Sequence, residues 1–279
     1  MARASIAVVV PYFGPPPLWM PAFLHSCRFN PDVHWLIYGD MEPTFPVPDN
    51  VFIRPMQLRE FNERASNALG ATVAIDPAGL RKICDFKPLY GLMFADALAA
   101  YAWWGYSDLD IVWGDIRRFM TDELLDAHDI VSSRDGKVAG PFSLFRNIES
   151  VNRVFEGIPD VATLLRSPQY LHIDEKVITR RLRDLRDKMR AEVPRFYWQQ
   201  ELTVSADYQR QLPDDASGQL WWRQGRTFDA QQQELMYLHF HKLKITMTAM
   251  GFGFDERPAS FCINRRGVFL QPDMVAVGV

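Results

Sequence analysis

The sequence predicts an α/β protein with a mostly parallel central sheet flanked by helices. Residues 6–10 form an apolar, largely β-branched run that stops at Pro11, a pattern typical of a strand buried on both faces of a parallel sheet. A helical spacing over 18–28 then leads to a second strand pattern over 34–38. Together these segments indicate a βαβ opening with residues 6–10 as the central strand.

The next segments continue the alternation of strands and helices, but their sequence patterns are weaker. A short strand is expected at 51–54, a polar helix at 58–69 and an Ala- and Leu-rich helix at 89–102, with Pro88 in its first turn. From residue 251 onward the sequence indicates irregular structure with one short strand at 268–270. A chain of 279 residues is long enough for one large domain or two small ones.

Composition excludes several classes of protein. A net charge of -3 lacks the basic footprint of a nucleic-acid binder, so no nucleic-acid partner is expected. Three widely spaced cysteines indicate neither a disulfide framework nor a structural zinc site, and a reducing cytoplasm is the simplest location. The apolar run near the N-terminus is too short to span a membrane, and no signal peptide is evident.

Two carboxylates one residue apart, Asp108 and Asp110, lie between aromatic residues and the apolar pair Ile111 and Val112. This pattern predicts a strand end or tight turn that directs oxygen ligands into one space, where a hard divalent cation could be held with open positions for phosphates. The alternative is an ordinary Asp-rich turn.

Other candidate ligand-binding residues follow from the predicted sheet. Ligands bind beyond the carboxyl ends of parallel strands, which places Tyr12, Phe13, Gly14 and Asp40 beside a ligand. The first strand is not followed by Gly-x-Gly-x-x-Gly, so a dinucleotide fingerprint is absent.

Asp85 and Lys87 are expected at the N-terminus of the 89–102 helix, where a Lys and free N–H groups can receive a phosphate. The alternative is a capping Asp beside a solvated Lys.

Several blocks of the chain, in order, resemble bacterial GT-A glycosyltransferases of the kind that build capsule and surface polysaccharides. The resemblance spans about residues 6–245. The matching blocks are Pro11-Tyr12-Phe13-Gly14, residues 82–87, the Trp103 to Asp115 stretch containing Asp108-Leu109-Asp110, residues 140–147, His172-Ile173-Asp174-Glu175-Lys176 and Tyr237-Leu238-His239-Phe240-His241-Lys242-Leu243-Lys244.

This resemblance implies a single GT-A domain over 1–279, with a donor half at about 1–115 and an acceptor half with a C-terminal segment at 116–279. It implies transfer of a sugar, of hexosyltransferase type, from a nucleotide-diphosphate sugar, by default a UDP-sugar, to a hydroxyl of a glycan or lipid-linked glycan. Such an enzyme would work in the cytoplasm or at the inner face of the cell membrane.

The resemblance also implies a site built around Mn²⁺, or alternatively Mg²⁺. Asp110 is the first choice as a direct ligand, Asp108 contacts the ribose hydroxyls, the metal or both, and His239 completes the coordination. His241 departs from the resembled pattern, and which histidine is the ligand stays open. Lys242 and Lys244 follow closely enough to meet the leaving phosphate.

Asp174 and Glu175 are the candidate bases if the reaction inverts the anomeric centre, which we favour, because a carboxylate can take the proton of the acceptor hydroxyl. A retaining enzyme needs neither as a base. Both residues also suit a helix N-terminus for dipole reasons alone.

An amphipathic basic helix is expected over 176–192, with an apolar stripe on one side and arginines elsewhere. Most such helices pack one face and solvate the other. The alternative is a contact with anionic lipid headgroups near a lipid-linked acceptor.

Three other functions use the same residues. A haloacid-dehalogenase-like phosphatase would use Asp108 as nucleophile and Asp110 as general acid, but that motif normally follows the first strand. A nucleotidyltransferase would need a Gly-rich phosphate loop that is absent here. A non-catalytic sugar- or nucleotide-binding GT-A relative should have lost its metal ligands.

Overall fold

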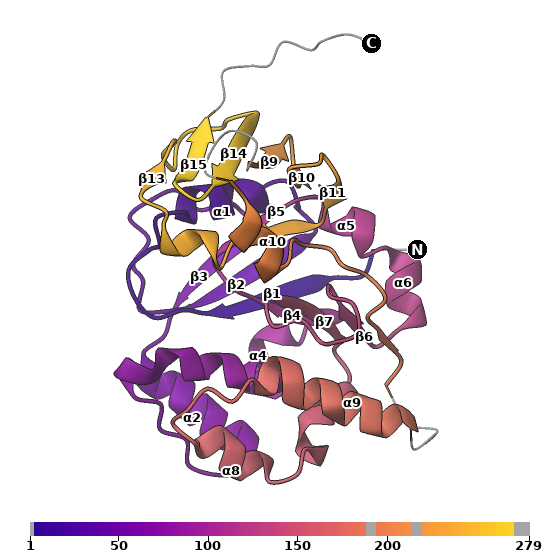
Figure 1. The fold of residues 1–279 in the computed structure, drawn as a ribbon. Coiled ribbons are helices and arrows are strands. Elements are labelled where there is room, and N and C mark those ends of the chain that lie inside the picture. The colour runs from indigo at the N-terminus through magenta and orange to yellow at the C-terminus, as the bar shows by residue number, and fades with distance from the viewer. Residues whose placement is uncertain (1–2, 188–193, 214–218, 271–279) are drawn as a thin grey trace.

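The computed structural model describes residues 3–187, 194–213 and 219–270. Its centre is a seven-stranded sheet in the order β3-β2-β1-β4-β7-β6-β8 (Figure 1). The strands are β1 Ile6–Pro11, β2 Val33–Gly39, β3 Val51–Pro55, β4 Trp103–Ser107, β6 Ile130–Ser132, β7 Phe142–Arg146 and β8 Phe196–Tyr197. Four of the six pairings are parallel, and only β7 runs antiparallel to its neighbours. The predicted α/β class with a mostly parallel sheet is confirmed.

Strand β1 lies at the centre of the sheet, as predicted. Val8 is paired with Trp35 on β2 and with Gly105 on β4, and residues 6–10 are all buried. Because β1 and β4 are parallel neighbours, their carboxyl ends meet at one edge of the sheet. The segments after these two strands, beginning at Tyr12 and Asp108, are therefore brought close together.

One face of the sheet is covered by a helical layer, seen below the sheet in Figure 1. Its elements are α2 Leu58–Leu69, η1 Pro77–Leu89, α3 Tyr90–Met93, α4 Ala95–Leu98, α7 Glu149–Asn152, η2 Val154–Gly157, α8 Val161–Arg166, η3 Ile173–Val177 and α9 Ile178–Asp187. Aromatic side chains of η1 and α3, such as Phe86 and Tyr90, pack here against Val9 and Tyr106 of the sheet.

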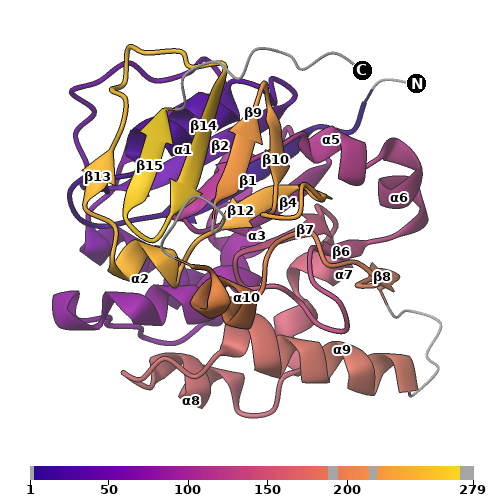
Figure 2. The same ribbon diagram turned by 45° about the horizontal axis from the view of Figure 1, so that its top comes forward.

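The other face is covered by α1 and by a second, C-terminal sheet that lies across α1 (Figure 2). This sheet has the order β11-β10-β9-β14-β15-β13. The elements on this side are α1 Met20–Cys27, α5 Ile116–Phe119, α6 Asp122–Ala127, α10 Ala206–Gln211, β9 Leu220–Arg223, β10 Arg226–Phe228, β11 Glu234–Leu235, η5 Leu243–Ile245, β13 Ala249–Met250, β14 Ser260–Asn264 and β15 Gly267–Leu270. His25 of α1 packs against Trp222 of β9, with ring centroids 4.8 Å apart.

A two-stranded antiparallel ribbon connects the two halves of the chain. It pairs β5 (Ile111–Trp113) with β12 (Tyr237–His239), so that His239 lies opposite Ile111. Trp222 of the C-terminal sheet donates a hydrogen bond to the carbonyl of Trp113, 3.0 Å away. The ribbon thus fixes a segment near residue 239 beside the end of β4.

The single helix predicted over 89–102 is wrong. The chain forms a 3-10 helix that contains Pro88 and then two one-turn helices, α3 and α4, which are separated at Phe94. Phe94 leaves the helical region (φ -120°, ψ 25°) and buries its ring against Tyr38 and Tyr90. Tertiary packing of aromatic side chains therefore overrides the local Ala- and Leu-rich propensity.

The C-terminal region is more ordered than predicted. Residues 251–270 were expected to be irregular apart from one strand, but β14 and β15 form an antiparallel pair within the second sheet. A half-buried strand is recognised by alternating apolar and polar residues, and this pattern is too short in β14 to predict the strand from the sequence.

The predicted basic helix begins as the π-helical turn η3 and continues as α9 to Asp187, while residues 188–192 lie outside the described residues. Its stripe packs inward through Ile178 and Leu182. None of the helices in the described ranges is long and apolar enough to cross a membrane.

Candidate metal centre

Asp108 and Asp110 lie in the short turn between β4 and β5, at the carboxyl end of β4. The turn is held on both sides by distant residues. The indole of Trp19 donates to the carbonyl of Leu109 (2.9 Å), and the amide of Phe240 donates to the carbonyl of Asp110 (3.1 Å). The carboxylates are therefore fixed by the fold, as expected for a strand-end turn.

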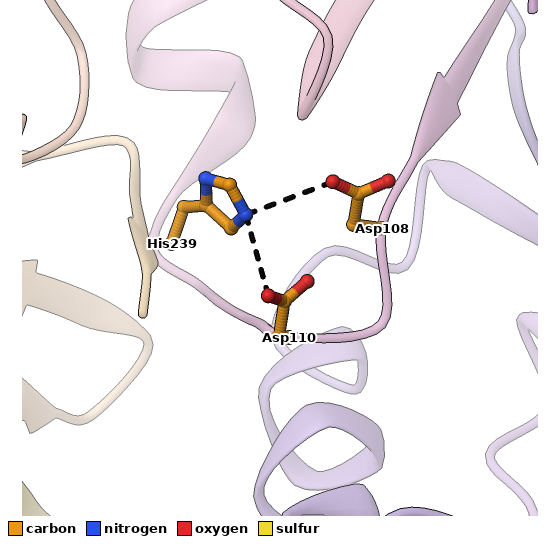
Figure 3. Close-up of side chains that lie close together, drawn as sticks. All are labelled: Asp108, Asp110 and His239. Atoms are coloured by element: carbon orange, nitrogen blue, oxygen red, sulfur yellow. Dashed lines mark ion pairs between the residues drawn. The ribbon is translucent and has the colours of Figure 1, made fainter. Parts of the chain in front are cut away.

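The β5–β12 ribbon brings His239 to the same point, and Figure 3 shows its ring directed at both carboxylates. His239 Nε2 lies 3.4 Å from Asp110 Oδ2 and 3.6 Å from Asp108 Oδ2. One potential ligand atom from each residue lies within 4.8 Å of the others. Two carboxylate oxygens and one imidazole nitrogen form a plausible set of ligands for a divalent cation.

Two of the donor atoms, His239 Nε2 and Asp110 Oδ2, have unused hydrogen-bonding capacity. His239 Nε2 and Asp110 Oδ2 are buried, and neither makes a hydrogen bond with the described residues. Lys244 Nζ forms an ion pair with Asp110 Oδ2 at 2.7 Å. Buried polar atoms without hydrogen bonds are costly, and a bound cation would satisfy them.

The electrostatics of Asp110 agree with this arrangement. Burial alone would raise the pKa of Asp110, but the neighbouring His239 and Lys244 lower this pKa below its usual value. The carboxylate is therefore ionised across the physiological range and ready to bind a cation.

Of the two histidines left open by the sequence, His239 is the one that faces the carboxylates. The ring of His241 stacks on that of His239, with centroids 4.6 Å apart. His241 lies just after the end of β12 and lines the same pocket.

A second group of charges adjoins the metal centre. Lys87 is buried, and its Nζ lies 2.7 Å from Asp108 Oδ1, 2.8 Å from the carbonyl of Gly140 and 3.8 Å from Asp174 Oδ2. Burial alone would lower the pKa of Lys87, but the neighbouring carboxylates raise it well above its usual value. Lys87 thus holds one oxygen of Asp108 while the other oxygen faces His239.

Asp174 is a buried carboxyl group at the edge of the pocket. Burial and the neighbouring Glu175 raise its pKa to about 7, against the opposing effect of Lys87. Tyr170 donates a hydrogen bond to Asp174 Oδ1 at 3.0 Å. Asp174 therefore changes protonation near neutral pH.

Glu175 has a different environment. Its Oε1 accepts a hydrogen bond from the amide of Gly140 at 3.1 Å. A Cβ atom at Gly140 would lie 2.5 Å from Glu175 Oε1 and 3.0 Å from Asp174 Oδ2. A side chain at position 140 would therefore displace the ends of these two acids from the 140 loop.

Most of the predicted site residues line one pocket of about 860 Å³. The predicted members found there are Pro11, Tyr12, Phe13, Lys87, Asp108, Asp110, Asp174, Glu175, His239, Lys242 and Lys244. Asp40 and Gly14 are not among the lining residues; Asp40 accepts a hydrogen bond from the amide of Gly14 (2.7 Å) and so supports the 11–14 loop from outside.

Asp85 was predicted to bind a ligand, but it does not line the pocket. Asp85 is fully buried, and its two oxygens accept hydrogen bonds from Lys82 Nζ (2.9 Å) and from the amides of Leu171 (2.8 Å) and Ile173 (2.8 Å). Asp85 and Lys87 lie inside η1, capped by Asp76, and not at a helix N-terminus. Asp85 therefore anchors the 171–173 segment and has no free oxygen for a ligand.

Several pocket residues were missed by the sequence analysis. They are Trp19, Arg81, Arg134, Lys137, Tyr170 and Arg210. Tyr170 lies four residues before Asp174, which is the one signal in the sequence that could have indicated it. The others reach the pocket only through the fold.

Comparison with known proteins shows the family of the chain. Residues 8–267 match a family of unknown function, DUF6625, so the chain belongs to that family. The sequence matches no curated protein.

Among solved structures, the fold is similar to mouse xyloside xylosyltransferase 1 in its apo form, with a TM-score of 0.44, 8% identity and coverage of 86% of this chain and 98% of that one. It is also similar to the galactosyltransferase LgtC in complex with donor and acceptor sugar analogs, with a TM-score of 0.44, 7% identity and coverage of 84% and 87%. At this level of similarity the function has to be argued from the site itself.

Proposed function

We propose that this chain is a metal-dependent glycosyltransferase of the GT-A type. The observation that carries the proposal is the convergence of Asp108, Asp110 and His239 at the carboxyl end of a central strand. His239 Nε2 is buried without a hydrogen bond, and the buried Asp110 Oδ2 has Lys244 as its ion-pair partner. This position in an open α/β sheet is where such folds bind nucleotides. The adjoining pocket of about 860 Å³ is within the size range of small-molecule and cofactor sites.

The proposed donor is a nucleotide-diphosphate sugar, by default a UDP-sugar, and the proposed transfer is of hexosyltransferase type. A divalent cation, Mn²⁺ or Mg²⁺, would offset the charge that grows on the diphosphate as the sugar leaves. Asp110 and His239 would hold it, and Lys87 would orient Asp108 toward it or toward the ribose. Lys244 is 39% exposed and lines the pocket with Lys242, and both would meet the diphosphate.

On the acceptor side we propose an inverting reaction with Asp174 as base. Its carboxyl group lines the pocket, and its pKa near 7 suits proton transfer at neutral pH. Glu175 then positions Asp174 and the 140 loop through its hydrogen bond to the Gly140 amide. The proposed acceptor is a hydroxyl of a glycan or lipid-linked glycan, as in polysaccharide biosynthesis.

We further propose a single GT-A domain in which residues 1–115 bind the donor and residues 116–279 contribute the acceptor side. We also propose that the protein works in the cytoplasm and that its basic helix contacts the inner face of the membrane. The contact is not needed to explain that helix, because Arg183 donates to the carbonyl of Gly136 and Arg186 lies over the ring of Phe196.

The proposal is tested by metal-dependent hydrolysis of a panel of nucleotide sugars with the parent, Asp110→Asn and a matched control, Asp126→Asn. Asp126 is exposed and lies outside the pocket. We expect the parent and Asp126→Asn to release nucleoside diphosphate only when Mn²⁺ or Mg²⁺ is present. Asp110→Asn should lose about 10²-fold or more in rate, the usual effect of removing transition-state charge stabilisation.

Two outcomes would contradict the proposal. Turnover that is insensitive to chelator, or an Asp110→Asn variant as active as the parent, would exclude the metal mechanism. Hydrolysis of p-nitrophenyl phosphate that depends on Asp108 would instead favour the phosphatase. Nucleotide binding without turnover of any donor would favour the non-catalytic relative.

A further inference from the structure

Three cationic side chains line the pocket without a carboxylate partner. Within the described part of the chain, no acid lies at ion-pair distance from Arg81, Lys137 or Lys242. The remaining lysines and arginines of the pocket do have such partners; Lys87 pairs with Asp108, for example, and Lys244 with Asp110. Lys242 follows the metal centre directly, whereas Arg81 comes from η1 on the other side of the pocket.

Arg81 is connected to the metal centre by a continuous chain of contacts. Its guanidinium lies 4.7 Å from the centre of the Tyr170 ring, and the Tyr170 hydroxyl donates to Asp174 at 3.0 Å. Asp174 in turn lies 3.8 Å from Lys87, which holds Asp108. The same phenol side chain therefore contacts both the Arg81 guanidinium, which has no acid at ion-pair distance in the described structure, and the proposed base.

The backbone next to this chain of contacts is strained. His172 has a positive φ of 59° and starts the π-helical turn η3. Its ring stacks against Tyr170 with centroids 4.3 Å apart, and its Nδ1 is buried without a hydrogen bond in the described structure. Non-glycine residues with positive φ and π-helical turns concentrate at functional sites, where surrounding contacts hold the strain.

Resting on the proposed function, we propose that Arg81, Tyr170 and His172 form the acceptor subsite and select a sugar that bears an anionic group, either a carboxylate or a phosphate. Arg81 binds that anion, and Arg is the side chain best suited to planar, bidentate recognition of both groups. Tyr170 contacts both Arg81 and Asp174, and so positions the bound anion relative to the hydroxyl that Asp174 deprotonates. His172 forms the wall of the subsite, and Lys137 adds positive charge.

The test measures binding of three monosaccharide probes by calorimetry, with and without UDP and Mn²⁺. The probes are methyl β-D-glucuronide, glucose 6-phosphate and the neutral methyl β-D-glucoside. We expect at least one anionic probe to bind about tenfold more tightly than the neutral sugar, the effect of one charge-assisted hydrogen bond. Which anionic probe binds better distinguishes a carboxylate from a phosphate.

Arg81→Gln should remove this preference, Arg81→Lys should keep part of it, and Arg59→Gln should leave it unchanged. Arg59 is a matched control because it is exposed on α2, pairs with Glu63 and lies outside the pocket. Equal binding of charged and neutral probes, no binding of either anionic probe, or a preference that survives Arg81→Gln would overturn the inference.

The same measurements separate this inference from the proposed function. A parent protein that binds UDP with Mn²⁺ but shows no anion preference refutes the subsite alone. A parent that prefers the glucuronide but binds neither UDP nor Mn²⁺ refutes the donor site and retains the anion-binding role of Arg81.

Discussion

Two pairs of an aspartate and a lysine, Asp85 with Lys82 and Asp110 with Lys244, differ in how completely their atoms are satisfied. Asp85 has both oxygens occupied, and Lys82 Nζ donates to Asp85, to the Leu164 carbonyl and to the Gln169 carbonyl, all at 2.9 Å. Asp110 Oδ2 is buried, and its ion-pair partner Lys244, 2.7 Å away, is 39% exposed and can turn to solvent. We call Asp85 with Lys82 the closed pair, because its atoms are satisfied within the fold, and Asp110 with Lys244 the open pair, because it has capacity left for a ligand. Asp85 and Asp110 are both buried, so burial does not distinguish a structural aspartate from one that can bind a ligand. The remaining hydrogen-bonding capacity distinguishes them.

The largest expected effect is on stability at the closed pair. Asp85→Asn leaves the ammonium of Lys82 buried without its counter-charge, and we expect a loss of about 3–5 kcal/mol in the free energy of unfolding. Asp110→Asn should cost about 1 kcal/mol or less, because Lys244 can turn to solvent. Urea unfolding in the presence of chelator measures both. Equal losses in the free energy of unfolding for the two variants would show that the two pairs do not differ as described.

The next effect concerns metal binding at the open pair. At a Mn²⁺ concentration about 100 times the dissociation constant, the free energy of unfolding should rise by about 2.7 kcal/mol. His239→Gln should abolish most of this gain, while His241→Gln should keep it, since only His239 faces both carboxylates. The measurement is urea unfolding with and without Mn²⁺. A gain that depends on His241 and not on His239 would reassign the ligand.

The smallest effect is a dependence of stability on pH at Asp174. Its pKa is raised to about 7 in the folded protein, so between pH 4 and 7 the folded state binds more protons than the unfolded state. Stability contributed by this group is therefore present at low pH and falls as pH rises toward 7. Asp174→Asn should be more stable than the parent by roughly 2 kcal/mol at pH 8, a value discounted from the full shift, and the gap should close near pH 4. Denaturation with chelator present at both pH values checks this, and a gap that widens on acidification would contradict it.

Much of the fold could be predicted because it follows from local patterns. The β-branched run at β1 and the bounds of α2 agree with the structure, since each depends on residues that are neighbours in the sequence. The helix over 89–102 was wrong because the position of Phe94 is set by Tyr38, far away in the chain. The same holds for Asp85, whose partners Leu171 and Ile173 are 86 and 88 residues distant.

The candidate site could be predicted only where the spacing of residues in the sequence indicates a chemical role. Asp108 and Asp110 form a recognisable pair in the sequence, and the resemblance indicated His239 as their partner. Nothing local shows that the oxygens of Asp85 are occupied, because Leu171 and Ile173 are distant in the sequence. Arg81 shows no pattern in the sequence, because its surroundings are created by Tyr170 from another segment.

The β5–β12 ribbon has a consequence for the order in which the protein is made. His239 is synthesised about 129 residues after Asp110, which corresponds to roughly 6–26 s of translation at about 5–20 residues per second. During that interval the emerging chain has two of the three ligands, and the third arrives only when β12 pairs with β5. The complete candidate centre is therefore assembled late in folding, after β12 has paired with β5.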